Sequence, residues 1–367
     1  MTVNQQDPLE YQNQLEAKIQ EFRRSMDAVA VDITDIAVHK SQPLGYRMRA
    51  EFRIWHEQGL VHYAMNRPGE KRPYIIDDFP IGAPLIGALM PPLLKALNAS
   101  EVLSHKCFSA EFLTTNSGEA LITLIYHRPL DASWETEARE LQEQLKVAII
   151  GRSRKQKLVL DRDYVTEQLT VNGREYSYQQ VESGFTQPNA GINTQMLSWA
   201  SNCLAESAQG DLLELYCGNG NFTAVLAEHF NQVMATEISK VSVNSALSNF
   251  AANQIDNVTV VRMSSEEFTQ ALNGQRPFRR LANIDLDNYN FSTIFVDPPR
   301  AGLDQDTEKL VSRFDHILYI SCNPQTLAKN LSAITKTHDI EAVAVFDQFP
   351  WTHHLESGVL LKRRAPI

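Results

Sequence analysis

The clearest chemical signal in the sequence is a cysteine at a strand-to-helix junction. Cys322 lies in the segment YISCNPQTL, where a predicted strand ends and a predicted helix begins. Asn323 is a favoured N-cap and Pro324 a favoured first helical residue. A thiol just before a helix N-terminus is biased toward the thiolate by the helix dipole, whereas an inert cysteine more often lies within a strand or on the apolar face of a helix. We therefore interpret Cys322 as a nucleophile.

Two carboxyl groups stand at similar junctions. Asp297 ends a predicted strand and precedes two prolines, which force an extended turn at the carboxyl end of the strand, where open α/β sheets bind ligands. Glu356 stands before the last predicted strand, at the end of the segment FDQFPWTHHLE. His353 and His354 in this segment suggest a metal, but neighbouring residues rarely point the same way and no HExxH or second acidic cluster accompanies them. We expect packing or substrate contact for both, and no metal.

A short turn with two glycines predicts a nucleoside cofactor. Residues 211–221, DLLELYCGNGN, read as a strand, a small-residue turn and a helix start, without the third glycine of GxGxxG or the lysine of a P-loop. Glu214 lies inside this strand, where a carboxylate can receive an ammonium group. Glu237 ends the next strand, about 19 residues past Gly218, where a carboxylate accepts hydrogen bonds from both ribose hydroxyls. A lone GxG also fits an ordinary tight turn, but with Glu237 the pattern favours S-adenosylmethionine.

A thiolate, a methyl donor and a carboxylate together favour methylation of a pyrimidine at C5. This carbon is too weak a nucleophile to take a methyl group unaided, but covalent addition of a thiolate at C6 produces an enolate and makes C5 electron-rich. A base must then remove the C5 proton so that the thiolate can leave. Cys322 fits the nucleophile and Glu356 the base.

The second half of the chain carries the elements that must position these residues. Strands and helices alternate there, which predicts βαβ units and a mostly parallel sheet in an α/β fold. The last two strands lie close together without a helix between them, which predicts an antiparallel hairpin at one edge of the sheet. The expected strands are 211–216, 232–237, 257–262, 292–297, 316–321, 340–346 and 357–362, and the expected helices are 188–207, 221–230, 240–254, 264–272, 305–313 and 324–335.

The first half predicts an α+β arrangement with antiparallel hairpins. Residues 8–27 have the apolar spacing of an amphipathic helix, and residues 47–54 alternate as a half-buried strand with Arg47, Arg49 and Arg53 on its wet face. We expect a hairpin partner at 60–65, a hairpin of 108–115 with 119–126, a helix at 85–97 broken by Pro91-Pro92, and a helix capped by Asp131. The three arginines and the basic run 152–157 are either phosphate contacts or an ordinary solvated face.

Composition sets the limits of this interpretation. The chain has 367 residues, a formal net charge of −10 and 4 cysteines, and 43% of its residues are hydrophobic. No stretch approaches the roughly 20 apolar residues of a membrane span, and the N-terminus has no features of a targeting signal. We therefore expect a cytoplasmic, reduced protein with two or three domains: a helical segment 1–40, an α+β domain 41–180 and an α/β domain 181–367, with the boundary near 170–185.

The negative charge is unevenly spread. Residues 1–180 carry about −3 and residues 181–367 about −7, so the acidity is concentrated in the α/β half. This balance argues against broad, nonspecific binding of nucleic acid but permits a local basic face on the first half. Such a face predicts recognition by shape and a few contacts, with moderate salt dependence.

At these motifs the sequence closely resembles the bacterial tRNA (uracil-5-)-methyltransferase family, within the RNA 5-methyluridine methyltransferases. The segments that carry the resemblance cover nearly the whole chain: YRMRAEFRIWH, GRSRKQK, FTQPN, LLELYCGNGNF, ATEI, FVDPPRAGL, ISCNP and FDQFPWTHHLE. The resemblance implies a class I methyltransferase fold, Rossmann-like, preceded by an RNA-binding domain. It also implies formation of ribothymidine at position 54 in the T-loop of tRNA, with transfer-messenger RNA (tmRNA) as a second substrate. We expect a monomer.

The resemblance also implies roles for individual residues. Residues that match the family's cofactor-binding positions are Gln187, Tyr216, Asn221, Glu237 and Asp297. Cys322 matches the nucleophile and Glu356 the proton acceptor. Trp351 departs from the tyrosine expected at its position, which puts the packing near Glu356 in doubt.

The cysteine positions discriminate within the family. Several ribosomal-RNA relatives carry a four-cysteine iron–sulfur cluster and an N-terminal barrel, but here only Cys107 precedes residue 200. We expect neither feature, which favours the tRNA branch. The target base must leave the T-loop stack to reach Cys322. Phe108 and Trp55 are candidates to hold the disrupted loop, although both also fit a core position.

Three alternatives stay open at this point. The first is a ribosomal-RNA 5-methyluridine methyltransferase with the same chemistry. The second is methylation of an adenine amino group, suggested by Asp297 and the two prolines after it, which needs no thiol. The third is a noncatalytic RNA-binding or RNA-folding protein.

Overall fold

The computed structural model describes residues 8–27, 29, 35–67, 69–70, 72–205 and 210–365. In that part of the chain, eight strands form one sheet in the order β1-β16-β17-β15-β14-β11-β12-β13. Neighbouring strands from β15 to β13 run parallel, whereas β17 runs antiparallel to both β15 and β16. The strands are β1 (Ala37–His39), β11 (Asp211–Leu215), β12 (Val233–Thr236), β13 (Val258–Val261), β14 (Phe291–Val296), β15 (His316–Ser321), β16 (His338–Phe346) and β17 (Glu356–Arg363).

Helices cover both faces of this sheet, because its central strands are apolar on both sides. One face packs against α1 (Pro8–Met26), α8 (Ser265–Leu272), α9 (Gln305–Val311) and α10 (Pro324–Ile334). The other packs against α5 (Ala190–Ala205), α6 (Asn221–Leu226) and α7 (Lys240–Ala252). Short 3-10 turns lie at Ala227–His229, Arg279–Leu281 and Leu286–Asn288. The result is a three-layer α/β unit with the arrangement of a class I methyltransferase.

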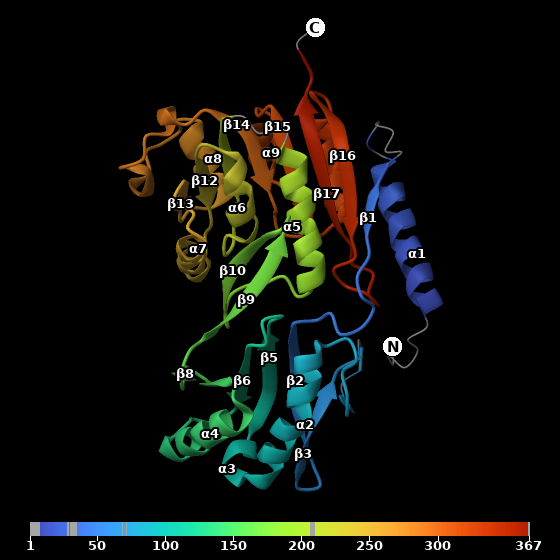
Figure 1. Cartoon of the computed structure of the whole chain (residues 1–367), viewed down its shortest axis with the longest axis vertical. Coiled ribbons are helices and arrows are strands. Elements are labelled where there is room, and N and C mark those ends of the chain that lie inside the picture. Colours follow the sequence, from blue (N-terminus) through green and yellow to red (C-terminus); the bar gives the residue numbers. More distant parts are fainter. Residues whose placement is uncertain are drawn as a thin grey trace.

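A second sheet is built by the first half of the chain and lies beside the α/β unit (Figure 1). Within the described residues its order is β4-β3-β2-β5-β6-β7-β8, antiparallel except where α4 carries the chain between the parallel β6 and β7. Its apolar face packs against three helices. The elements are β2 (Arg49–Glu57), β3 (Leu60–Met65), β4 (Tyr74–Ile75), α2 (Pro84–Ala99), α3 (Glu101–Ser104), β5 (Cys107–Thr114), β6 (Ala120–Tyr126), α4 (Ala132–Leu145), β7 (Ala148–Ser153) and β8 (Gln156–Val159).

A hairpin that the sequence analysis did not predict joins the two parts. Strands β9 (Tyr164–Val171) and β10 (Arg174–Val181) pair with each other and pack against α5 and α7. Asn172-Gly173 forms the turn, with both residues at positive φ. This dipeptide is the strongest local signal for a hairpin. The division into residues 1–40, 41–180 and 181–367 stays a prediction.

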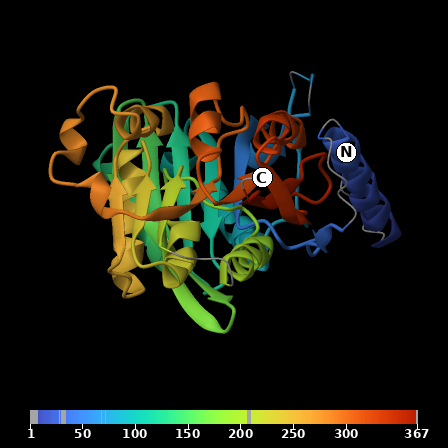
Figure 2. The same ribbon diagram turned by 90° about the horizontal axis from the view of Figure 1, so that it is seen from above.

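Two expectations about the elements were wrong. The helix at 85–97 is not broken, because α2 continues through Pro91 and Pro92. Its buried face, which includes Leu89 and Leu93, packs on the sheet and outweighs the lost backbone hydrogen bonds. The antiparallel pair β16–β17 does form, but it does not lie at the sheet edge, because β1 pairs in parallel with β16 outside it. Figure 2 shows α1 on the same flank of the molecule. The expected helix 188–207 corresponds to α5, and residues 206 and 207 lie outside the described part.

Candidate active site

One edge of the large sheet gathers the candidate site residues. Asp297 follows β14, Cys322 follows β15 and Glu237 follows β12, and these parallel strands end at the same edge. Because β17 runs antiparallel to β15, its first residue, Glu356, lies at that edge as well. This is the position where open α/β sheets bind ligands.

The register of β15 and β17 brings the nucleophile and the base together. Ser321 pairs with Ser357, and the Ser357 hydroxyl donates to the Ser321 carbonyl at 3.2 Å. Cys322 follows Ser321 and Glu356 precedes Ser357, so both residues adjoin the last pair of this ladder. The negative charges of Glu356 and Asp297 both act on the Cys322 thiol, which shows that the three side chains share one electrostatic environment.

The expected thiolate bias at Cys322 is wrong for the protein without substrate. Burial, followed by the charges of Glu356 and Asp297, raises the pKa of the thiol to about 11. Arg300 and the backbone at the start of α10 act in the opposite direction but are outweighed. A helix dipole has its main influence near an exposed terminus, whereas Cys322 is half-buried beside two carboxyl groups. The resting thiol is therefore protonated at neutral pH.

Buried Glu356 and half-buried Asp297 lie beside the thiol, and buried Glu214 interacts with Asp297. Burial, followed by the charge of Asp297, raises the pKa of Glu356 to about 8. Burial alone raises the pKa of Asp297 to about 7. Burial also raises the pKa of Glu214 to about 8, and the charge of Asp297 acts in the same direction. Carboxyl groups with pKa values near neutrality suit proton transfer, and their crowding favours a cationic ligand.

The turn after Asp297 is attached to the first turn of α10. Asn323 donates from its side chain to the carbonyl of Arg300 at 3.1 Å, and Thr326 donates to the same oxygen at 3.3 Å. The Asn330 carboxamide oxygen accepts from the backbone of Leu303 at 3.0 Å. These bonds connect the segment that carries Asp297 to the helix that follows Cys322, so the two side chains are positioned by one rigid unit.

The glycine turn leaves open space where a ligand can approach. Tyr216 follows β11 in the left-handed region at φ 65°, and Gly218 and Gly220 come next with φ 56° and 79°. A Cβ added to Gly218 would meet no atom within 4 Å, whereas one added to Gly220 would lie 2.7 Å from the Phe250 ring. Gly218 therefore faces open space, and Gly220 is needed for close packing on α7.

Glu237 lies beside this turn, as its spacing predicted. Its carboxylate accepts from the backbone N–H of Gly218 at 3.1 Å and of Ser239 at 2.7 Å. The buried Glu214 Oε2 has no hydrogen-bond partner among the described residues. Glu237 is half-exposed at the turn, and Glu214 is buried with this one unpartnered oxygen. Both carboxyl groups can accept hydrogen bonds from a ligand. This arrangement fits a nucleoside with an ammonium group and a positively charged sulfur.

The remaining predicted cofactor residues have partners that the sequence analysis missed. Asn221 exchanges two side-chain hydrogen bonds with Asn193 of α5, at 2.9 and 2.8 Å. Gln187 accepts from the Gln348 amide at 2.7 Å. Tyr216 packs its ring toward the core on the α8 and α9 side. Gln348 could have been found from the FDQFP segment, which the sequence analysis had singled out. For Asn193 the one available signal is its place on a predicted helix close to the glycine turn.

The histidine pair does not form part of a larger cluster. The ring centres of His353 and His354 lie 4.1 Å apart with the rings tilted by 39°, and burial lowers the pKa of His354. Nowhere in the described residues do three or more histidine, cysteine, aspartate or glutamate side chains gather as metal ligands. None of the helices described combines the length and apolar character needed to cross a membrane.

An aromatic and basic surface lies on the second sheet. An open depression there is lined by Arg53, Trp55, Lys106, Phe108 and His127, among others. Phe108 stacks on His127 with ring centres 4.2 Å apart, and the Arg53 guanidinium lies 5.3 Å from the Phe108 ring and 5.4 Å from the Trp55 ring. Phe108 and Trp55 are half-buried, so neither occupies the core position that was the alternative.

Arg49, Arg152 and Lys157 of the first half are engaged within the protein. Arg49 donates to the carbonyl oxygens of Glu182 and Gly184, and Arg152 forms a two-pronged ion pair with the Glu182 carboxylate at 2.6 Å. Lys157 bonds Asp163 at 2.7 Å. These contacts argue against phosphate contacts for Arg49, Arg152 and Lys157. Arg53 is the arginine directed to the aromatic surface.

The chain is similar over its whole length to proteins of one family. Residues 10–364 match the family model described as tRNA (Uracil-5-)-methyltransferase. A tRNA/tmRNA (uracil-C(5))-methyltransferase of Cellvibrio japonicus is 57% identical over 96% of this chain and 96% of its own length. A protein of the same description from Azoarcus sp. is 56% identical over 100% of both chains. Among solved structures, the Pyrococcus abyssi tRNA (uracil-54, C5)-methyltransferase with S-adenosyl-L-homocysteine has a TM-score of 0.72 at 18% identity, covering 96% of this chain and 83% of that one.

Proposed function

Since the chain belongs to the tRNA (uracil-5-)-methyltransferase family, we propose that it methylates C5 of the uridine at position 54 in the T-loop of tRNA. The same reaction extends to the tRNA-like part of tmRNA, the second substrate in the names of its relatives. The methyl donor is S-adenosyl-L-methionine. Cys322 is the covalent nucleophile and Glu356 the base that completes the reaction.

The observation that carries this assignment is the register of β15 and β17. Cys322 and the buried Glu356 both adjoin the last β15–β17 pair, at the edge where open α/β sheets bind ligands. Methylation of an amino group needs neither a nucleophilic thiol nor a base placed beside it. Methylation at uracil C5 needs both, on the same side of one small ring.

Each of the two residues has one task in the reaction. The Cys322 sulfur, once deprotonated, bonds to C6 of the uracil, and the C5–C6 π electrons move toward the ring carbonyl as an enolate. When bound, S-adenosyl-L-methionine supplies an electrophilic methyl group, which C5 takes up. Glu356 then removes the C5 proton, the C6–S bond breaks and the sulfur leaves as thiolate. With a pKa near 8, Glu356 is a base matched to neutral pH.

The carboxyl groups around the glycine turn would hold the cofactor. Glu237 would accept from the ribose hydroxyls, and Asp297 with Glu214 would offset the positive charge of the ligand. Gln187, Tyr216 and Asn221 complete the proposed set. Asn193 fixes the Asn221 amide from behind, and Gln348 occupies the Gln187 oxygen, so that the Gln187 amide nitrogen stays available as a donor.

The aromatic and basic surface on the second sheet would receive the T-arm. Arg53 and the stacked Phe108–His127 pair offer flat, partly exposed groups on which bases can stack once the loop opens. Opening the loop is required because the target base must leave its stack to reach Cys322. We further propose a cytoplasmic monomer that needs no metal; light scattering after size exclusion tests the monomer.

A trapping experiment tests the assignment. The enzyme is mixed with unmodified T-arm RNA and methyl-labelled cofactor, and covalent protein–RNA adducts are resolved under denaturing conditions. Glu356→Gln should accumulate an adduct that carries the methyl group, Cys322→Ala should form none, and Glu175→Gln, at an exposed acid on β10, should behave as wild type. Absence of adduct in both wild type and Glu356→Gln would overturn covalent catalysis. Methyl transfer retained by Cys322→Ala would favour an amino-group target, and a preference for ribosomal RNA over tRNA would move the substrate to the other branch.

A further inference from the structure

The segment that leads into Glu356 is a loop between two paired strands. Phe346, the last residue of β16, pairs with Glu356, the first residue of β17. Residues 347–355 therefore leave the sheet and return to it at the catalytic base. The Phe346–Glu356 pair is the terminal pair of the β16–β17 ladder, so Glu356 is attached to the sheet on one side and to the loop on the other. The position of Glu356 therefore depends on how firmly the loop is held.

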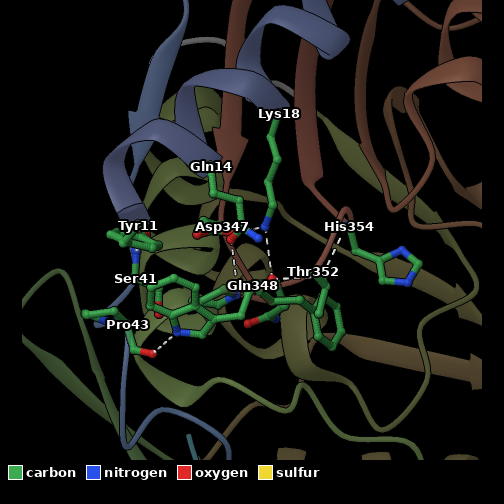
Figure 3. Close-up of polar contacts among 12 residues, drawn as sticks. Tyr11, Gln14, Lys18, Ser41, Pro43, Asp347, Gln348, Thr352 and His354 are labelled. Atoms are coloured by element: carbon green, nitrogen blue, oxygen red, sulfur yellow. Dashed lines mark hydrogen bonds and ion pairs between the residues drawn. The ribbon is translucent and has the colours of Figure 1, made fainter. Parts of the chain in front are cut away.

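A lysine from the N-terminal helix holds the start of this loop. Lys18 of α1 donates to Asp347 Oδ1 at 2.7 Å and to the Phe349 carbonyl at 2.9 Å. Lys18 is 5% exposed and Asp347 0%, so the ion pair is withdrawn from water. Figure 3 shows the lysine reaching down from α1 to the loop. The Asp347 backbone N–H donates in addition to the His39 carbonyl of β1 at 3.0 Å.

The contact of Lys18 continues along the loop toward Glu356. The Phe349 carbonyl that accepts from Lys18 also accepts from the Thr352 hydroxyl at 2.8 Å. The Thr352 hydroxyl in turn accepts from the backbone N–H of His354 at 3.1 Å. His354 lies two residues before Glu356. An unbroken line of hydrogen bonds therefore runs from α1 to the residue next but one to the base.

Neutral contacts reinforce the same attachment. The Trp351 backbone N–H donates to Gln14 Oε1 of α1 at 2.7 Å, and its indole N–H donates to the Pro43 carbonyl at 2.7 Å. Tyr46 donates to the Pro350 carbonyl at 3.0 Å. Trp351 adopts φ 66°, a left-handed conformation that a bulky residue keeps only when its surroundings fix it. The loop is thus fixed from residues far away in the sequence.

We propose that Lys18 is a positioning residue for methyluridine release: it fixes the loop that places Glu356 against the C5 proton. The inference rests on the proposed role of Glu356 as the base. Attachment of α1 alone does not require Lys18, because Phe22 and Met26 already bury the helix in the apolar core. A buried ion pair is also weak evidence for stability, since apolar residues of similar volume often replace one without loss.

A kinetic experiment separates positioning from a structural role. Single-turnover reactions with T-arm RNA and methyl-labelled cofactor yield two rates, one for appearance of the covalent adduct and one for its breakdown to free methylated RNA. Glu356 acts in breakdown alone, so Lys18→Met should slow breakdown by about tenfold or more, because a well-placed general base contributes about 10²–10⁴-fold. Adduct formation should stay within about threefold of wild type, since Cys322 is held by other contacts.

Two further variants keep the test decisive. Lys18→Met with Asp347→Leu removes the buried pair without leaving an unpaired charge, and it should still show slow breakdown because the contact to the Phe349 carbonyl is missing. Lys40→Met is the matched control: this exposed lysine bonds Gln12 of α1 at 3.0 Å but does not touch the loop, and both rates should match wild type. If Lys18→Met does not fold, the double variant decides.

The outcomes distinguish this inference from the proposed function. Equal slowing of formation and breakdown, or wild-type rates in the double variant, would overturn the positioning role and leave the role of Glu356 intact. Failure of the wild type to form any methylated adduct would overturn the proposed function itself. Selective slowing of breakdown in both Lys18 variants supports the inference.

Discussion

Replacing Glu356 by glutamine should make the protein more stable at neutral and alkaline pH, at the expense of activity. The reason is that folding buries this carboxyl group and raises its pKa from 4.5 to about 8. Between those two values the folded protein retains a proton that the unfolded chain has already lost. Stability in this window therefore falls as pH rises, and glutamine, which does not ionise, is free of that loss.

The size of the effect follows from the same shift. Each unit of pKa difference corresponds to about 1.4 kcal/mol. From pH 5 to pH 8 the group crosses roughly three quarters of this window, so the free energy of unfolding of the wild type should fall relative to Glu356→Gln by about 3.5 kcal/mol. Asp297 and Glu214 also titrate with raised pKa values, but they are present in both proteins and largely cancel in the comparison.

Urea unfolding at pH 5, 6.5 and 8 measures this difference. Glu175→Gln serves as the control, because this exposed side chain has nearly the same hydration in both states and its curve should parallel wild type. If the gap between wild type and Glu356→Gln widens by less than about 1 kcal/mol from pH 5 to pH 8, the carboxyl group is hydrated in the folded protein and the argument from its burial is refuted.

Three further predictions concern the thiol, the cofactor and the RNA. Alkylation of Cys322 by iodoacetamide, followed by peptide mass spectrometry, should accelerate up to about pH 11 and should be faster in Glu356→Gln, which removes a neighbouring negative charge; a rate that levels off below pH 9 would contradict the raised pKa. Glu237→Ala should weaken S-adenosyl-L-methionine binding in calorimetry by about 10²-fold, because two hydrogen bonds to a charged group are each worth about 1.5–3 kcal/mol; an unchanged affinity argues against the ribose contact. Phe108→Leu should weaken T-arm binding in fluorescence anisotropy by about tenfold while leaving cofactor affinity intact, since base stacking contributes about 1–3 kcal/mol; equal RNA affinity would remove Phe108 from the interface.

Much of the α/β half could be predicted because its information is local. Runs such as Ile294–Val296 and Ile317–Ile320 are hydrophobic and buried throughout, as strands covered on both faces must be. The residues that follow such strands, Asp297 and Cys322, could be placed at the ligand edge by the general rule for parallel sheets. Placing Glu356 at this edge required knowing that β17 runs antiparallel to its neighbours. The short, helix-free connection between the last two strands indicated that direction.

The remainder depended on contacts between distant parts of the chain. The raised pKa of Cys322 could not be predicted from its helix-start position, because it results first from burial and then from Glu356 and Asp297, which lie at the ends of two other strands. Strand β1 spans only Ala37–His39 and has no pattern of its own; it exists because β16 offers an edge. The continuity of α2 through two prolines follows from the apolar face that it buries. The hairpin β9–β10, by contrast, carried a local Asn-Gly signal that could have revealed it.

The bond between Lys18 and Asp347 spans 329 positions of the sequence. A ribosome delivers the chain from the N-terminus onward, so the second sheet can fold on emergence, while α1 and β1 wait for nearly the entire chain to be synthesised. An incomplete nascent chain can thus form the aromatic and basic surface of the second sheet before the loop that leads to Glu356, the proposed base, is fixed. The contact between Lys18 and Asp347 can form only when nearly the whole chain has been synthesised.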